Sequence, residues 1–275
     1  MSAQLLYEIS GNNSQSKSYL LATNKLSDIS FLDTIPNLFR VFGRCDKVIT
    51  EMALSTEDAR QALVVASTLP DSMSLRELYT LDEYKKISDG VMLTMELSLD
   101  KLTRIKPAYL TEMYRNELLK RWLAYDENRS SEIFFQSIAE ERGLPVIALD
   151  DTGEALFMLF DREPLNWQTK ELLKIVEYPE REIRQERRIL ELYKLGQLNE
   201  ISYQVAMPDN QSTLSYSDYQ IFCRRNPVWV KRLAPYLTEG SAFICLNCIY
   251  IGGEEGLIAQ LRKAGYKVRA VNRKI

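Results

Sequence analysis

The chain has 275 residues, of which 45% are hydrophobic, and its 35 basic and 38 acidic residues give a formal net charge of −3. This balance leaves no basic excess that would favour nucleic acid or an anionic membrane as a partner. The chain contains no histidine, which excludes a Ser-His-Asp triad, a Cys-His pair and a zinc site with imidazole ligands. Acid–base chemistry would fall to Asp, Glu, Lys, Tyr or Cys.

The sequence carries no mark of a secreted or membrane-spanning protein. The first residues, MSAQLLYEISGNN, lack the basic and apolar regions of a signal peptide. No run approaches the roughly 20 apolar residues of a membrane span. The four cysteines are too few for a disulfide framework in a chain of this length. We expect a soluble, cytoplasmic protein, unless a targeting segment precedes this sequence, folded as one domain or two closely packed lobes.

The amino-terminal part predicts three strands and two helices. Residues 5–10 (LLYEIS) and 18–23 (SYLLAT) are strand-like, and the turn-rich GNNSQSK between them predicts a β-hairpin. Residues 47–53 (KVITEMA) predict a third strand, with a helix over about 31–42 before it. Ser55 is expected to begin the next helix as the first residue of a capping box.

The middle of the chain is mostly helical in pattern. Ser74 and Glu77 form a second capping box. Apolar residues then recur at three- and four-residue steps over about 89–124, with Pro107 as an interruption. A further helix is predicted over 132–142.

Strands return towards the carboxyl end. Residues 144–149 (LPVIAL) form a continuous apolar run, which is typical of a strand buried on both faces. The remaining predicted elements, in chain order, are helices over 154–198 and 216–237, a buried strand over 241–246, a helix over 256–263 and a last strand over 266–271.

Strands thus alternate with helices at both ends of the chain, around a helical region of about 54–142 and 152–237. This order predicts a single α/β domain over residues 1–275, with a central mixed sheet flanked by helices. Two segments echo each other, since SYLLATNK and FICLNCIY both run from an apolar strand into a short polar turn. Such carboxyl ends are where open α/β sheets usually bind ligands.

The second of these segments contains a Cys-x-x-Cys motif, Cys245 and Cys248. Two cysteines at this spacing can contribute to a zinc site or form a redox dithiol. A zinc site needs four ligands, however, and the sequence has neither a second such motif nor a histidine. On a strand, residues three apart point to opposite faces, which favours Cys245 as a small core residue.

Taken in order, these segments resemble the TraB/GumN family, which includes the TIKI metalloproteases and has the erythromycin-esterase/ChaN-like fold. The resemblance covers nearly the whole chain. Its segments are LLYEISGNNSQSKSYLLATNK, CDKVITEM, LPDSMSLRELYTLDEYKKI, the Ile-Lys-Pro of 105–107, EERGLPVIALDDTGEALFMLF, ELYKLGQLNEI, RRNPVWVKRLAPYL and SAFICLNCIYIGGEEGLIAQLRKAGYKVRAV.

The chain departs from the family at the residues that matter most for chemistry. The family's first Gly-x-x-His motif is matched by Ala22 and Lys25, and its second by Asn247 and Tyr250. The Cys-x-x-Cys motif therefore stands where the family has its second Gly-x-x-His, and we interpret it as incidental. Two further family positions also differ. The usual glutamate of Leu-Glu-Thr is Asp150, and a glutamine expected soon afterwards is Ala155. Family residues that remain are Glu51, Arg225 and Asn226.

The resemblance implies a divalent metal held by the two histidines and the glutamate, where it would activate water. In this chain, Lys25 would repel such an ion, and Tyr250 is a poor metal ligand at neutral pH. Glu51 and Asp150 alone would make a weak site. We therefore expect no metal and no other cofactor.

The candidate site is therefore a degenerate one, made of Lys25, Glu51, Asp150, Arg225 and Tyr250. Lys25 either pairs with Glu51 or lies on a loop and points into solvent. Arg225 either holds a carboxylate, from Glu51, Asp150 or a ligand, or is a surface residue of its helix.

These residues support two hypotheses about function. In the first, the protein is a non-catalytic relative of metal-dependent peptidases and hydrolases, a pseudoenzyme that binds a peptide, a small ligand or a partner protein in the old active-site cleft. In the second, it is a working hydrolase or peptidase with a rebuilt, histidine-free site. There, Glu51 or Asp150 is the base, and Lys25, Arg225 or Tyr250 is its oxyanion or proton partner. Loss of both motif histidines favours the first.

Overall fold

The computed structural model describes residues 4–52, 57–126, 129–206 and 216–271. Their contacts divide the chain into two compact units. Unit 1 is built from Met1–Met52, Asp126–Asp150 and Arg187–Ile275, and unit 2 is built from Ala53–Tyr125 and Asp151–Glu186. No helix among the described residues is long and apolar enough to cross a membrane.

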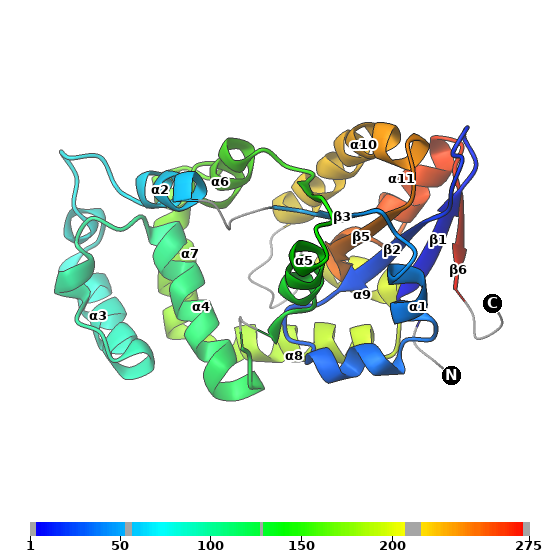
Figure 1. The fold of residues 1–275 in the computed structure, drawn as a ribbon. Helices are drawn as coiled ribbons and strands as arrows, with labels where there is room; N and C mark the ends of the chain where they lie inside the picture. The colour runs from blue at the N-terminus through cyan, green and yellow to red at the C-terminus, as the bar shows by residue number, and fades with distance from the viewer. Residues whose placement is uncertain (1–3, 53–56, 127–128, 207–215, 272–275) are drawn as a thin grey trace. The chain divides into compact units, whose positions relative to one another are not determined.

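Unit 1 contains a six-stranded mixed sheet, which confirms the predicted α/β class (Figure 1). Its strands are β1 (Leu6–Ser10), β2 (Ser18–Thr23), β3 (Lys47–Thr50), β4 (Val146–Ala148), β5 (Ala242–Asn247) and β6 (Lys267–Ala270). Their order across the sheet is β4-β3-β5-β2-β1-β6. β1 pairs antiparallel with β2 and β6, whereas β5 pairs parallel with β2 and β3, and β3 pairs parallel with β4.

The predicted hairpin is present, and its turn explains the sequence between its strands. Gly11, Asn12 and Asn13 have φ values of 85°, 50° and 64°. Glycine and asparagine are the residues that adopt this left-handed conformation most readily. The turn therefore reverses the chain, so that β1 and β2 pair from Leu6 opposite Leu21 to Ile9 opposite Ser18.

The helical elements of unit 1 surround this sheet. They are η1 (Ile29–Thr34), α1 (Leu38–Phe42), α5 (Ser131–Glu141), α9 (Leu198–Ala206), α10 (Tyr216–Thr238), η5 (Cys248–Tyr250), α11 (Leu257–Lys263) and the later part of α8 (Pro179–Lys194). α5 packs against β3, β4 and β5, and α11 packs against β6.

Two expectations for unit 1 need correction. The single helix expected over 31–42 is a 3₁₀ turn followed by the short helix α1, because Pro36 and Asn37, whose φ is 64°, interrupt it. The strand expected to be buried on both faces over 144–149 is β4, which lies at the edge of the sheet and is only half-buried. An edge strand has one neighbour, so apolar side chains there do not require full burial.

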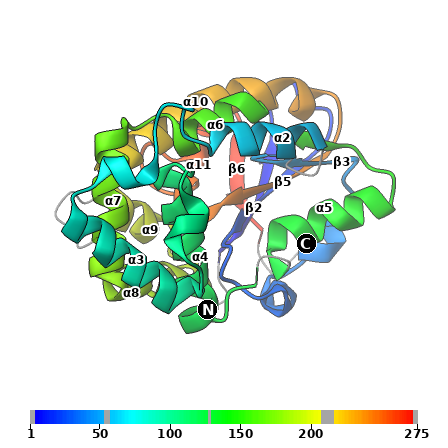
Figure 2. The ribbon, with the colours of Figure 1, turned by 90° about the vertical axis from the view of Figure 1, so that its left-hand side faces the viewer.

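Unit 2 is helical. Its elements are α2 (Glu57–Ala66), η2 (Leu75–Leu78), α3 (Leu81–Met95), η3 (Leu99–Leu102), α4 (Pro107–Leu123), α6 (Thr152–Phe160), α7 (Leu165–Glu177) and the first part of α8. α3, α4 and α7 pack against one another (Figure 2) around a core that includes Ile87, Tyr114 and Leu172.

The capping box of Ser74 and Glu77 is confirmed at η2, where the backbone N–H of Ser74 donates to the Glu77 carboxylate over 2.8 Å. Ser55 lies outside the described residues. The long helical pattern of 89–124 is wrong as one element, since it is divided between α3, η3 and α4. Pro107 is the first residue of α4, a position where the missing N–H of proline costs nothing.

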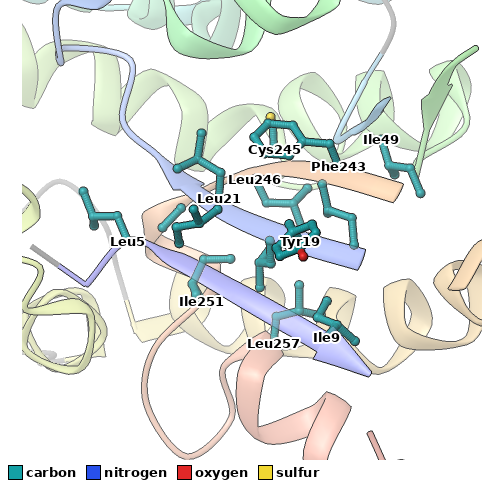
Figure 3. Close-up of a cluster of buried hydrophobic side chains, with 14 of the residues drawn as sticks. Leu5, Ile9, Tyr19, Leu21, Ile49, Phe243, Cys245, Leu246, Ile251 and Leu257 are labelled. Carbon is teal, nitrogen blue, oxygen red and sulfur yellow. The ribbon is translucent and has the colours of Figure 1, made fainter. Parts of the chain in front are cut away.

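The core of unit 1 lies on both sides of its central strands (Figure 3). Cys245 is fully buried there on β5, as predicted, and it is a free thiol. Cys248 is also buried and forms no disulfide with Cys245, but it begins η5 beyond the end of the strand, so the expected alternation of faces does not apply to it. Burial raises the pKa of the Cys245 thiol well above its ordinary value, which makes it a poor nucleophile.

Candidate site at the carboxyl edge of the sheet

Four parallel strands end at the same edge of the sheet in unit 1. β2 and β5 are aligned so that Thr23 lies opposite Asn247. β3 and β4 continue in register beyond their last paired residues, because Leu149 N–H donates to Thr50 O over 2.8 Å and Asp150 N–H donates to Glu51 O over 3.0 Å. The two echoing segments of the sequence, and the ends of β3 and β4, therefore meet at one edge.

Each of the five candidate residues lies at or near this edge. Lys25 is half-buried in the turn that follows β2. Glu51 follows β3, and Asp150 follows β4. Tyr250 is the last residue of η5, directly after β5, and Arg225 projects from α10.

An arginine connects three of these elements. The Arg225 guanidinium forms an ion pair with Asp150 and donates a hydrogen bond of 2.6 Å to the Tyr250 hydroxyl. It also lies 4.5 Å from the centroid of the Trp229 ring and 5.1 Å from that of the Tyr250 ring, within the range of cation–π interactions. Although burial opposes its charge, Tyr250, Glu51 and Asp150 raise the pKa of Arg225 above its ordinary value. Arg225 is thus a fixed cation of the site.

Two more side chains on the same face of α10 bind the Asp150 carboxylate. The Trp229 indole N–H donates to the Asp150 carboxylate over 2.6 Å, and the Arg232 guanidinium lies 3.4 Å from it. Arg225, Trp229 and Arg232 are four and three residues apart, a spacing that places side chains on one face of a helix. Only Arg225 of these three is a candidate from the sequence, although their spacing indicates that all three lie on one face of the helix.

Glu51 is held in a different way. One oxygen of its carboxyl accepts a hydrogen bond of 2.8 Å from the backbone N–H of Asn247. Asn247 is the residue that matches the glycine of the second Gly-x-x-His motif. Burial, and next the nearby Glu132 carboxyl, raise the pKa of Glu51 from 4.5 to about 8, against the opposing effect of Arg225. Around neutral pH, the protonated form of Glu51 is therefore favoured.

Glu132 is a member of the site that the sequence did not reveal. It lies in the first turn of α5, and the Thr23 hydroxyl at the end of β2 donates to it over 2.5 Å. Burial raises the pKa of Glu132 as well, while Thr23 lowers it. In the sequence, an acidic residue in the first turn of a helix has an ordinary explanation in the helix dipole, so no local signal distinguished it.

Asn226, beside Arg225, fixes the segment that carries Tyr250. Its amide nitrogen donates to Tyr250 O over 3.1 Å and to Glu255 O over 2.9 Å. Burial, followed by Glu51, raises the pKa of the Tyr250 hydroxyl well above its ordinary value. The phenol is therefore neutral and serves the site as a hydrogen-bonding group.

The donor set of this edge does not suit a divalent metal. Among the residues that the structure describes, no three acidic or cysteine side chains are grouped so that they could hold a metal ion. Asp150 is paired with the Arg225 guanidinium, which is a cation, and the protonated form of Glu51 is favoured at neutral pH. Lys25 adds a further positive group at the same edge.

Comparison with known proteins tests the family expected from the motifs. A family model described as the TraB/PrgY/gumN family matches residues 5–270, nearly the whole chain. The expected family is thereby confirmed. Neither a curated protein nor a solved structure matches the chain.

Removing the Arg225 guanidinium is expected to destabilise unit 1. In Arg225→Gln, the Asp150 carboxylate, whose side chain is 8% exposed, loses its closest cation. Breaking a buried ion pair in this way costs about 3–5 kcal/mol in the free energy of unfolding, measurable by urea denaturation. Arg232→Gln is the matched control, because this side chain is 34% exposed and more distant from Asp150. Its expected cost is below about 1 kcal/mol. Equal losses in both variants would contradict the central role of Arg225.

The raised pKa of Glu51 predicts that stability falls as pH rises. Between about pH 5 and pH 8, folded Glu51 retains a proton that the unfolded chain has released, so each rise in pH favours unfolding. Glu51→Gln keeps the hydrogen-bond acceptor without the titrating proton. Its melting temperature is therefore expected to fall less over this range than that of the unmodified protein, by several degrees. Glu200→Gln, at an exposed position of α9, is the control. Parallel pH profiles for Glu51→Gln and the unmodified protein would refute the prediction.

Proposed function

Because this chain belongs to the TraB/PrgY/gumN family, we propose that it is a metal-independent and non-catalytic member. It would bind a peptide, a small ligand or a partner protein at the carboxyl edge of its sheet. The observation that carries the proposal is the state of Tyr250, whose hydroxyl accepts a hydrogen bond from Arg225 and whose raised pKa keeps it neutral. Tyr250 stands where the second family motif has histidine. A neutral phenol that is hydrogen-bonded to the Arg225 guanidinium is a poor metal ligand.

Electrostatics supports this proposal. A divalent ion at this edge would have to bind without either motif imidazole and close to the Lys25 ammonium, because Lys25 and Tyr250 stand at those two positions. It would also have to displace the proton from Glu51, whose pKa is raised to about 8, because metal ligands must be deprotonated. Both requirements oppose metal binding. Neither opposes the binding of a neutral or polar ligand by Glu51, Glu132 and Tyr250.

A metal titration tests the proposal. We expect purified protein to contain no stoichiometric manganese, cobalt or zinc, and added metal to leave its melting temperature unchanged. An ion that bound only the folded state at a hundred times its dissociation constant would stabilise that state by about 2.7 kcal/mol, which a thermal melt detects. Stoichiometric metal together with such a stabilisation would overturn the proposal.

One observation favours a second candidate function, a hydrolase whose acid and base are both carboxyl groups. Burial raises the pKa of both Glu51 and Glu132, and Glu132 raises that of Glu51 further. A protonated and an ionised carboxyl in one site can act as general acid and general base. In this alternative, Arg225 would stabilise the negative charge that develops on the substrate.

Peptide hydrolysis without metal separates the two functions. For the non-catalytic protein, we expect no cleavage of a mixed peptide library in the presence of EDTA between about pH 5 and pH 8, a range that covers the titration of Glu51. Cleavage that is lost in both Glu51→Gln and Glu132→Gln, while these variants stay folded by circular dichroism, would establish the hydrolase instead. The control is Glu200→Gln, which should leave any such cleavage unchanged.

A further inference from the structure

Unit 2 contains a cleft of about 690 Å³ that the function proposed above does not use. This volume falls within the range typical of small-molecule sites. The cleft is formed by α2, the segment after it, the residues that lead into α4, and the connection between α6 and α7. Its lining residues are Val64, Val65, Thr68, Leu69, Pro70, Asp71, Arg104, Lys106, Asp161, Glu163, Pro164, Leu165 and Gln168.

Backbone hydrogen bonds fix one wall of the cleft. Leu69 N–H donates to Arg104 O over 2.7 Å, and Lys106 N–H donates to Ser67 O over 2.8 Å. These bonds join two segments that the family resemblance singled out separately, the Leu-Pro after α2 and the Ile-Lys-Pro before α4. A wall held in this way is present before any ligand arrives, which lowers the entropic cost of binding.

Gln168 fixes the opposite side. Its side chain is buried on α7. The amide oxygen accepts a hydrogen bond from Ala108 N–H at the start of α4, and the amide nitrogen donates to Phe160 O and Glu163 O. All hydrogen-bonding positions of the Gln168 amide but one are thus used, and they join α4, α6 and α7. Gln168 supports the cleft and is not available to read a ligand.

Apolar side chains dominate the cleft and its rim. Leu69, Pro70 and Leu165 line it, and Val64 and Val65 project from α2, which packs beside α6 (Figure 1). Val64 is 64% exposed and Val65 is 75% exposed. Two adjacent, water-exposed valines at the mouth of an apolar cleft provide surface that an apolar ligand would cover.

The lining also contains two ion pairs, Lys106 with Asp161 and Arg104 with Asp71. The Lys106 side chain is only 11% exposed, and its ammonium forms an ion pair with Asp161, whose side chain is 43% exposed. Asp161 ends α6, so its carboxylate can turn into water without disturbing the helix. Arg104 also donates to Leu69 O, and the Glu163 carboxylate accepts a hydrogen bond from Arg162, which is not a lining residue.

We propose that this cleft binds a small organic acid with an apolar body, whose carboxylate takes the place of Asp161 opposite Lys106. The apolar body would lie against Val64, Val65 and Leu165. Asp161 shows that a carboxylate fits the position in front of the ammonium. Of the two cations in the described lining, Lys106 is the less exposed, at 11% against 45% for Arg104. A single ammonium matches a monoanion better than a phosphate, which arginine clusters usually bind.

Calorimetric titration of the full chain with octanoate, octanol and octylamine tests this site. Octanoate is expected to bind, and the alcohol and the amine are expected to bind at least about tenfold more weakly, because they lack a charge-assisted hydrogen bond to Lys106. Lys106→Met should weaken octanoate binding by about the same factor. Asp161→Asn should strengthen it, because the competing internal carboxylate is removed.

If a change at Lys106 impairs folding, substitutions at the rim of the cleft test the same proposal. Val65→Asp should weaken octanoate binding, whereas Leu93→Asp, also at 75% exposure but on α3 and outside the cleft, should not. Equal affinity for octanoate and octanol would overturn the proposal, as would binding that Val65→Asp leaves unchanged. Binding only of an apolar peptide with a free carboxyl terminus, and of no small acid, would overturn it as well. Metal content and peptide hydrolysis are independent of these outcomes.

Discussion

The parallel pairing of β5 with β2 on one side and β3 on the other is the constraint on which the site depends. Parallel strands that start in register also end together, so the groups that follow them are delivered to one edge. Lys25, Glu51 and Tyr250 are widely separated in sequence and follow β2, β3 and β5, which this pairing aligns, and the pairing of β4 with β3 adds Asp150. The positions that resemble the family motifs lie at these strand ends.

Changing those residues alters the electrostatic balance of the edge. A guanidinium carries one positive charge and directs its hydrogen bonds in a plane, whereas a metal ion concentrates two charges at a point. Arg225 satisfies this planar geometry with Asp150, Tyr250 and the face of Trp229. The Glu132 carboxyl is buried and its pKa is raised as well, which favours its neutralisation by a proton.

Much of the fold was predictable, because alternation and apolar runs are local signals. All six strands were expected close to their observed positions, as was α10. One error arose where a single residue, Asn37, interrupts a helix. The other arose at β4, where the position of the strand at the edge of the sheet determines its burial. Within the site, Arg225 followed from the resemblance. Glu132 did not, because its importance arises from the packing of α5 beside β3 and β5, which no local pattern encodes.

The place of β5 in the sheet also has a consequence for the order of synthesis. β2 and β3 leave the ribosome long before the strand that separates them in the finished sheet, which comes from residues 242–247. Until then, the edges of β2 and β3 have no partner at this position, and unpaired strand edges invite association with other chains. Contacts this distant in sequence also slow folding. The nascent chain therefore passes through a long interval in which unit 1 cannot be completed.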